Sequence, residues 1–430
     1  MKIAIITAGG AGMFCGSCMQ DNTLARTLRL AGEDAILVPT YTPIRVDEDD
    51  VSADRVFMGG VNVYLDSKLP GWRLLPRWMT RWLDRPQLIR RLTRFGGGTE
   101  ASKLGSLTLD MLQGTAGPQR REVVELVDYL CNNLRPDVIL FSNALLSGVL
   151  SELRPRFSGN ILCLLQGDDV FLDGLSSRWK APVFTQLRQN CEAFDGFLTH
   201  SHYYRDFMTE YLQLPDQKFR RIPLTIDVSD HPALLSEAAD NATGEEVTRP
   251  FRIGYFARIC PEKGVQNVLA AATEILPDLP HAEIAIAGYL PDQHRQWFHR
   301  LLRKAQKEFP DRIHWLGSPD RRSDKFRIIS SFDVLCVPTE YHEPKGLYVL
   351  EAGLCGVPAL LPAHGAFPEM IAAVEHGTTY DRADVTGLSQ ALRSVVAAGR
   401  QPASDLPDRV KKNFCMAATG PSLVEAISSF

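Results

Sequence analysis

The sequence lacks three features that would place it in a specialised class: an excess of charge of one sign, a long hydrophobic run, and a full metal-binding cysteine pattern. Lys and Arg number 47 against 51 Asp and Glu in 430 residues, a net charge of −4 that gives no reason to expect nucleic acid as a partner. No stretch approaches the roughly 18 apolar residues of a membrane-spanning helix. The apolar run after Met1 is too short for a signal peptide. These absences predict a cytoplasmic protein.

The nine cysteines offer little for a disulfide framework. Cys163, Cys336 and Cys355 lie in apolar runs, as small buried residues of a reducing compartment do. Cys15 and Cys18 have the spacing of a redox pair or of half a zinc site. A second C-x-x-C is absent from the sequence, so we predict no metal site. We interpret the pair as small residues in a tight loop, with redox chemistry as the alternative.

Short apolar runs alternate with amphipathic segments along the chain, the pattern of an α/β protein whose parallel strands are buried on both faces. Hydrophobic residues make up 45% of the sequence, enough for full-size cores. We expect helices at residues 123–132 and 203–212, among others. Expected strands are residues 2–7, 35–38, 137–141, 161–165 and 196–199 in the first half, and 252–256, 283–287, 313–316, 334–337 and 359–361 in the second.

Two domains account for this pattern. Residues 1–235 form an N-terminal Rossmann-like domain, and residues 251–405 form a second one. Residues 236–250 are polar without an apolar period and end in Pro250, which predicts a linker. Residues 406–430 are expected to form a C-terminal helix that returns to the first domain. Two such domains facing each other would bind a ligand in a cleft between them, at the carboxyl ends of their strands.

Glu343 and Glu351 lie eight positions apart, after the expected strand 334–337. A helix that begins near Gly346 would offer unpaired N–H groups to a phosphate. Glu351 could then reach a ribose, and Glu343 a sugar hydroxyl. The alternative is an ordinary surface acid followed by an acid in the first turns of a helix.

Arg258 and Lys263 follow the expected strand 252–256, just before a helix that we expect to begin near Val265. Two fixed cations at a strand's carboxyl end suit a diphosphate, whose negative charge increases as it leaves. A solvated loop is the alternative for this segment taken alone.

Together these residues resemble glycosyltransferase family 4, the retaining nucleotide-sugar glycosyltransferases with the GT-B architecture of two facing Rossmann-like domains. Residues 365–369 also match the family's Gly-x-Pro-Glu turn. The resemblance implies that Arg258 and Lys263 hold the donor diphosphate, Glu351 the ribose and Glu343 the transferring sugar. The backbone of Gly346, Leu347 and Tyr348 would meet the phosphates. Pro344 and Lys345 stand where the family commonly has Gly and Phe, a departure that bears on sugar preference.

In the first domain, the resemblance aligns Gly16 with the second glycine of the family's Gly-Gly loop, and so with the donor. Gln166 stands where the family usually has a His near the sugar. With Asp168, we assign it to the catalytic site as a hydrogen-bonding and orienting group. The alternative is a turn after the strand in which Asp168 caps the next helix.

The segment 68–95 has eight cations and one acid, a local net charge of +7. Arg77, Arg81 and Arg85 recur every four residues beside Trp78 and Trp82, so a helix here would have a basic face and an aromatic one. Such a face fits an anionic membrane surface or a lipid-linked or anionic acceptor, which would place the protein at the inner face of the membrane. The alternative is a solvated cover over the core.

The resulting functional hypothesis is a retaining glycosyltransferase that moves a sugar from a nucleoside diphosphate donor to the hydroxyl of a glycan, lipid-linked or small-molecule acceptor. The reaction needs no cofactor and no metal, because the two cations can stabilise the leaving diphosphate. A nucleotide-sugar 2-epimerase on the same fold and a non-catalytic sugar-binding or membrane-binding protein are the alternatives.

Overall fold

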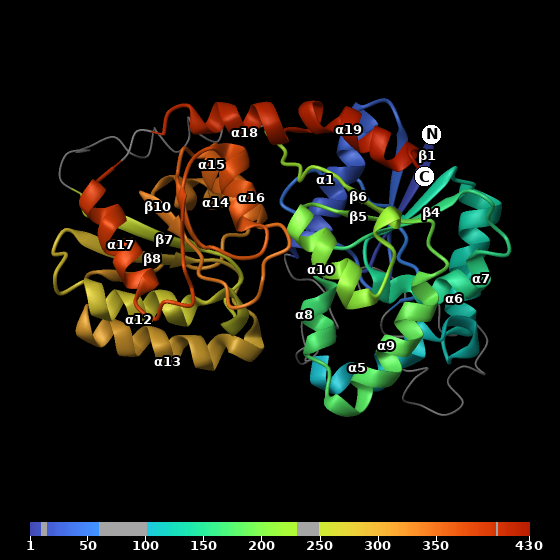
Figure 1. The fold of residues 1–430 in the computed structure, drawn as a ribbon, viewed down its shortest axis with the longest axis horizontal. Helices are drawn as coiled ribbons and strands as arrows, with labels where there is room; N and C mark the ends of the chain where they lie inside the picture. Colours follow the sequence, from blue (N-terminus) through green and yellow to red (C-terminus); the bar gives the residue numbers. More distant parts are fainter. Residues whose placement is uncertain (10–14, 60–100, 230–248, 401–402) are drawn as a thin grey trace. The chain divides into compact units, whose positions relative to one another are not determined.

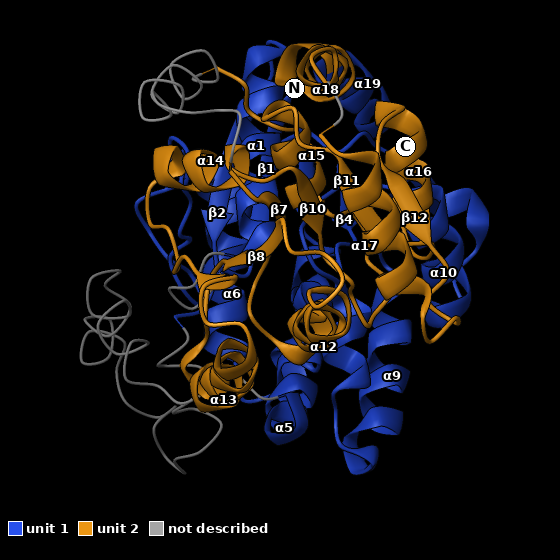
Figure 2. Ribbon diagram, turned by 90° about the vertical axis from the view of Figure 1, so that its left-hand side faces the viewer, with its two compact units in different colours: residues 1–225, 419–430 blue, residues 226–418 orange. Residues whose placement is uncertain are grey.

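The computed structural model describes residues 1–9, 15–59, 101–229, 249–400 and 403–430. They divide into two compact α/β units, residues 1–225 with 419–430 and residues 226–418 (Figures 1 and 2). Each unit has one six-stranded parallel sheet, which confirms the predicted class of two Rossmann-like domains. The basic segment 68–95 and most of the predicted linker lie outside the described residues.

The sheet of unit 1 has the strand order β2-β1-β3-β4-β5-β6. Its helices are α1 (Gly16–Leu30), α5 (Ala101–Leu112), α6 (Arg120–Asp128), α7 (Leu150–Leu153), α8 (Asp168–Asp173), α9 (Ser177–Cys191) and α10 (His202–Leu212). A π-helical turn at Tyr129–Leu134 continues α6. The strands are β1 (Lys2–Thr7), β2 (Asp34–Pro39), β3 (Val138–Phe141), β4 (Asn160–Leu164), β5 (Gly196–Thr199) and β6 (Phe219–Arg221).

Both faces of this sheet are buried, because alternate residues of each strand enter two different cores. In β1, Ile3 and Ile5 point to one core, while Ala4 and Ile6 point to the other. This is why the strands appear in the sequence as continuous apolar runs. The expected strands of the first half match β1 to β5 to within one or two residues, whereas β6 was not predicted.

The sheet of unit 2 has the order β12-β11-β10-β7-β8-β9. Its helices are α12 (Val265–Ile275), α13 (Asp292–Glu308), α14 (Arg322–Ser330), α15 (Leu347–Leu354), α16 (Phe367–Val374), α17 (Gly387–Ala398) and α18 (Leu406–Phe414). The strands are β7 (Phe251–Phe256), β8 (Ala282–Ala287), β9 (Ile313–Trp315), β10 (Val334–Cys336), β11 (Ala359–Pro362) and β12 (Thr378–Tyr380).

The C-terminal segment differs from the single returning helix that we expected at 406–430. It forms two helices, α18 and α19 (Met416–Ser428), and only the chain from Thr419 onward belongs to unit 1. Leu406 and Val410 of α18 are buried, and α18 packs on α15 of unit 2, where Gly353 leaves room for Val410. In unit 1, Leu423 and Ile427 of α19 pack in the same core as α1.

The first domain ends ten residues earlier than the predicted position 235. From Ile226 onward the chain belongs to unit 2, because it is bound there on two sides. The N–H of Ile226 donates to the carbonyl of Phe414 at 2.9 Å. Arg322 of α14 donates to the carbonyl of Asp227 at 2.6 Å.

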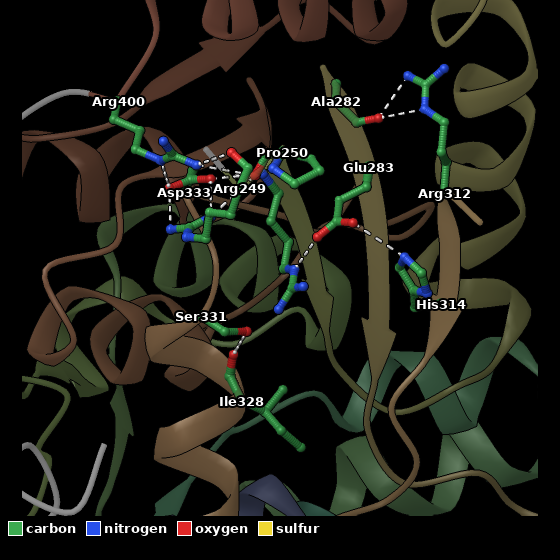
Figure 3. A network of polar contacts seen from close by, with 11 residues as sticks. Arg249, Pro250, Ala282, Glu283, Arg312, His314, Ile328, Ser331, Asp333 and Arg400 are labelled. Carbon is green, nitrogen blue, oxygen red and sulfur yellow. Dashed lines mark hydrogen bonds and ion pairs between the residues drawn. The ribbon is translucent and has the colours of Figure 1, made fainter. Parts of the chain in front are cut away.

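A network of hydrogen bonds and ion pairs joins chain segments at the amino-terminal ends of the unit 2 strands (Figure 3). Asp333, which directly precedes β10, accepts two hydrogen bonds from Arg249, both of 2.7 Å, and one of 2.9 Å from Arg400. Its carboxylate also accepts the N–H of Arg252 in β7 at 2.7 Å. One buried carboxylate thus joins the chain before β7, the start of β10 and the end of α17.

Candidate functional site

The residues predicted to bind the donor lie on two neighbouring loops of unit 2. Strands β7 and β10 pair in parallel, with Ile253 opposite Val334 and Gly254 opposite Leu335. Carboxyl ends of parallel strands share one edge of a sheet, so the loop 257–264 after β7 and the loop 337–346 after β10 lie side by side. Gly264 makes their contact possible: its φ is +75°, and a Cβ atom there would lie 1.7 Å from the carbonyl oxygen of Pro338.

Lys263 and Glu343 form an ion pair between these loops. The ammonium of Lys263 lies 2.5 Å from Oε2 of Glu343, and the two side chains are 12% and 5% exposed. The same oxygen accepts hydrogen bonds from the hydroxyls of Tyr341 at 2.9 Å and Tyr348 at 3.0 Å. The ammonium also lies 5.0 and 4.9 Å from the ring centres of these two tyrosines. Arg258, the second predicted cation, is exposed on the same loop as Lys263.

The ionisation of Glu343 follows from these contacts. Burial by itself would raise the pKa of its carboxyl group, but the charge of Lys263 and the three hydrogen bonds outweigh burial and lower the pKa below its ordinary value. Burial and the adjacent carboxylate raise the pKa values of Tyr341 and Tyr348. At neutral pH Glu343 is therefore an anion surrounded by protonated donors.

Helix α15 begins at Leu347, next to this ion pair, as the sequence predicted. Gly346 precedes it with φ +68°, and Tyr348 lies in its first turn. The turn at Gly365 lies directly against the backbone of Glu343. A Cβ atom at Gly365 would lie only 2.6 Å from both the backbone N and O of Glu343, so only glycine fits there. The N–H of Ala366 donates to the carbonyl of Glu343 at 2.8 Å.

Glu351, the second acid of the predicted pair, is buried in α15. Its Oε1 accepts a hydrogen bond of 2.7 Å from the ammonium of Lys325 in α14. The sequence reasoning missed Lys325, because a lysine in a polar helix stretch normally indicates solvent exposure. It also missed the hydroxyl of Tyr341, although this residue lies only two positions before Glu343.

In unit 1, Gln166 and Asp168 follow β4 and are both buried. Nε2 of Gln166 donates to Oδ1 of Asp21 at 2.8 Å, and Asp21 accepts a hydrogen bond of 2.6 Å from the hydroxyl of Thr7 at the end of β1. Gln166 is thus held by a helix that lies 145 positions away in the sequence, a contact that no sequence pattern indicated.

Asp168 is the first residue of α8, but its side chain does not cap this helix. Its carboxylate accepts the N–H groups of Ala144 at 2.7 Å and Gln166 at 3.1 Å, so it joins the ends of β3 and β4. Burial raises the pKa of Asp168 to about 6, despite these hydrogen bonds.

Gly16, assigned to the donor by resemblance, is the first residue of α1. It is exposed, and a Cβ atom placed on it would meet nothing within 4 Å. Gly16 is therefore open to solvent on the side where a side chain would stand. The glycine-rich residues 10–14 before it lie outside the described part of the chain.

Neither a metal site nor a membrane span is found in the described parts of the chain. In these parts no three His, Cys, Asp or Glu side chains gather in a way that could hold a metal ion. None of the helices described is both long and apolar enough to cross a bilayer. The basic segment 68–95, with its predicted membrane or acceptor contact, is outside the residues to which these statements apply.

Comparison with known proteins points to one family. Residues 237–413 match the family model of "Glycosyl transferases group 1". Glycogen synthase of Mycobacterium tuberculosis is 30% identical over 176 residues, which are 39% of this chain and 40% of that protein. The chain thus spans less than half the length of this curated relative.

Two solved structures share the fold along almost the whole chain. Sucrose-phosphate synthase from Thermosynechococcus elongatus superposes with a TM-score of 0.70 at 18% identity, covering 99% of this chain and 98% of that one. HepE of Anabaena in complex with UDP-glucose superposes with a TM-score of 0.65 at 15% identity, with full coverage of both chains. With its two Rossmann-like units, the protein therefore has the GT-B fold, and within its second unit residues 237–413 match the group 1 glycosyl transferases.

Proposed function

We propose that the protein is a retaining glycosyltransferase that moves a sugar from a nucleoside diphosphate sugar to a hydroxyl acceptor. The observation that carries the proposal is the cluster around Glu343, in which a lysine ammonium, a carboxylate and two phenolic hydroxyls meet beside the start of α15. It lies at the carboxyl ends of neighbouring parallel strands, where α/β sheets bind ligands. The complex of HepE with UDP-glucose supports a nucleotide sugar as the donor.

Lys263 and Arg258 would bind the donor diphosphate. Breaking the bond between the sugar and the phosphate increases the negative charge on the leaving diphosphate, and a fixed cation stabilises that charge more than the ground state. Lys263 is already fixed by Glu343 and the two tyrosine rings, so little reorganisation is needed. The N–H groups of Gly346, Leu347 and Tyr348 would contact the phosphates. Glu351 would bind the ribose.

Glu343 would hold the sugar. Because its pKa is lowered, it is ionised at neutral pH and accepts hydrogen bonds from sugar hydroxyls. This orients the anomeric carbon for attack. The leaving phosphate would take the proton of the acceptor hydroxyl, so that the new bond forms on the same face and the configuration is retained. In the first unit, Gly16 would contact the donor, and Gln166 and Asp168 would act as hydrogen-bonding and orienting groups. The reaction proposed here uses no resident cofactor and no metal.

The acceptor would be a hydroxyl compound, either a glycan, a lipid-linked molecule or a small molecule. The cationic segment 68–95 favours an acceptor that is anionic or linked to a lipid, and a position at the inner surface of the membrane.

The first experiment screens UDP-, GDP- and ADP-sugars for thermal stabilisation of the full chain, since a ligand that binds only the folded state raises the melting temperature. The donor found is then incubated with candidate acceptors. We expect release of the nucleoside diphosphate together with a product of retained anomeric configuration, measured by NMR. Isomerisation of the donor without an acceptor would instead identify an epimerase, and binding without turnover a non-catalytic protein.

Two variants test the assigned residues. Lys263→Ala and Glu343→Ala should each lower transfer by about tenfold or more, the effect of losing one transition-state contact. Lys304→Ala and Glu308→Ala on the exposed face of α13 are matched controls and should retain full activity. Wild-type turnover in both site variants would refute the assignment.

A further inference from the structure

Two cysteines lie together at the start of α1. Cys15 is the residue that precedes the helix, with φ −113° and ψ 121°, and Cys18 is the third residue of the helix. These are the positions just before a helix and at its third residue, whose side chains lie close enough to contact each other. The two side chains accordingly form a hydrogen bond with each other. Both residues are free thiols in the structure.

The two thiols have different surroundings. Cys18 is 3% exposed, and its hydrogen bond to Cys15 and its burial both raise its pKa. Cys15 is only partly buried, and the neighbouring Gly16 has no atoms near the place of a Cβ. A small reagent can therefore reach Cys15 more easily than Cys18.

Cys18 is also connected to the predicted catalytic residues of unit 1. Its thiol forms a hydrogen bond with the hydroxyl of Thr7. Thr7 donates to Asp21, and Gln166 donates to the other oxygen of Asp21. This series of buried polar contacts runs from the thiol pair to the end of β4.

We propose that Cys15 and Cys18 are a redox-active dithiol that closes to a disulfide by exchange with a low-molecular-weight disulfide such as oxidised glutathione. The thiolate of Cys15 attacks one sulfur of the reagent, and the first thiol leaves as the Cys15 mixed disulfide forms. Cys18 then loses its proton to solvent, and its sulfur attacks Sγ of Cys15, which releases the second thiol. Two protein thiols are oxidised by two electrons, and one disulfide is reduced to two thiols.

Formation of the disulfide between Cys15 and Cys18 should change the contacts around Thr7. The disulfide removes the hydrogen bond between the two thiols and leaves the Cys18 sulfur as only a weak acceptor beside the Thr7 hydroxyl. The bond also fixes the start of α1, including Gly16. Oxidation would in this way act on the segment that the proposed function assigns to the donor, although the dithiol chemistry itself does not depend on that function.

The test uses the full-length reduced protein in glutathione buffers of graded ratio. The thiols are trapped with an alkylating reagent and the protein is digested with trypsin. The peptide of residues 3–26 contains Cys15 and Cys18 and no other cysteine. We expect a doubly alkylated peptide under reducing conditions, and an unalkylated peptide, two hydrogens lighter than the dithiol, under oxidising ones. A peptide that stays doubly alkylated, or stops at a mixed disulfide with glutathione, would overturn the proposal.

Single variants test the order of attack. Cys18→Ser should accumulate glutathione on Cys15, because the second step is blocked, whereas Cys15→Ser should leave Cys18 unmodified. Cys336→Ser, a change in the fully buried strand β10, is the control and should still close the bond between Cys15 and Cys18. Glutathione on Cys18 in the Cys15→Ser protein would contradict the assignment of Cys15 as the attacking thiol. The wild-type measurement remains decisive if a variant does not fold.

Discussion

The ammonium of Lys325 lies 2.7 Å from Oε1 of Glu351, and both side chains are 7% exposed. This buried ion pair joins α14 to α15, the helix whose start lies beside Glu343. Glu351 was assigned to the donor ribose from its place in the helix after Gly346 and from the resemblance. The pair gives this carboxylate a structural partner as well, so the two roles have to be separated by experiment.

We predict that Lys325→Met destabilises the protein by about 3 kcal/mol or more, because it leaves the Glu351 carboxylate buried without its counter-ion. The double variant Lys325→Met with Glu351→Leu should recover most of this loss, since neither charge then remains. Urea unfolding measures both effects. If Glu351 binds the ribose, the double variant will be stable but will no longer be stabilised by the donor.

The control for this prediction is the exposed ion pair of Arg295 and Asp292 in α13, with side chains 61% and 80% exposed. Solvent screens such pairs, so Arg295→Met should change the free energy of unfolding by less than about 1 kcal/mol. A loss as large as that of Lys325→Met would contradict the importance of burial. Full donor binding by the stable double variant would remove Glu351 from the ribose site.

A second prediction concerns Gly365, whose φ is +63° and which lies against the backbone of Glu343. Gly365→Ala should weaken donor binding by about tenfold or more, because the new methyl group displaces the loop that carries Glu343 and a small displacement at a reacting centre is costly. Gly356→Ala is the control, since φ there is +70° but the nearest atom to a Cβ would be the carbonyl oxygen of Ala403 at 3.6 Å, an ordinary contact.

Both substitutions place alanine at a positive φ, which costs on the order of 1 kcal/mol of stability. At Gly365 the contact of the new methyl group with the backbone of Glu343 adds to this cost. Only Gly365→Ala should change the donor affinity, measured by titration calorimetry. Equal affinities in the two variants would show that the turn at Gly365 does not position Glu343.

The sequence predicted those features that depend on neighbouring positions and repeated patterns. The strands bearing the site were recognised because both of their faces are buried, and Lys263 and Glu343 because each follows such a strand. The three-residue edge strands β6 and β12 were not predicted, because both contain polar residues and exposed positions, such as Arg221 and Thr378. Lys325, the partner of Glu351, and Asp21, the partner of Gln166, were also not predicted. They come from other helices, and their positions depend on tertiary packing.

The third prediction is a dependence of stability on pH. Burial raises the pKa of Asp168 to about 6 in the folded protein, compared with 3.8 ordinarily. Between these two values the folded state holds a proton that the unfolded state has lost. The contribution of Asp168 to stability therefore falls as the pH rises through this interval, by up to about 3 kcal/mol, and is constant above it.

Asp168→Asn removes this titration. Urea unfolding from about pH 4 to about pH 7 should show that the difference in stability between wild type and variant changes across the interval and then levels off. Gln217→Ala, which removes an exposed side chain that does not titrate, should give a constant difference. Parallel pH profiles of wild type and Asp168→Asn would refute the raised pKa.

The last prediction concerns Asp333, whose side chain is only 4% exposed while its partners Arg249 and Arg400 are 38% and 40% exposed. Asp333→Asn replaces an acceptor shared by three groups with an amide that can accept on one oxygen only. Hydrogen bonds between charged groups contribute about 1.5–3 kcal/mol each, but water solvates the two arginines when they are released. We therefore expect a total loss of about 2–3 kcal/mol, nearer to one such bond than to three.

This loss should be confined to the second unit, because the described partners of Asp333 (Arg249, Arg252 and Arg400) all lie there. Hydrogen exchange followed by mass spectrometry should show faster exchange in β7 and β10, whereas β1 and β4 should keep their wild-type rates. Asp292→Asn in α13, where the carboxylate is 80% exposed, should change neither set. Equally accelerated exchange in both sheets would mean that the two units unfold as one cooperative body and that the Asp333 network stabilises the whole chain.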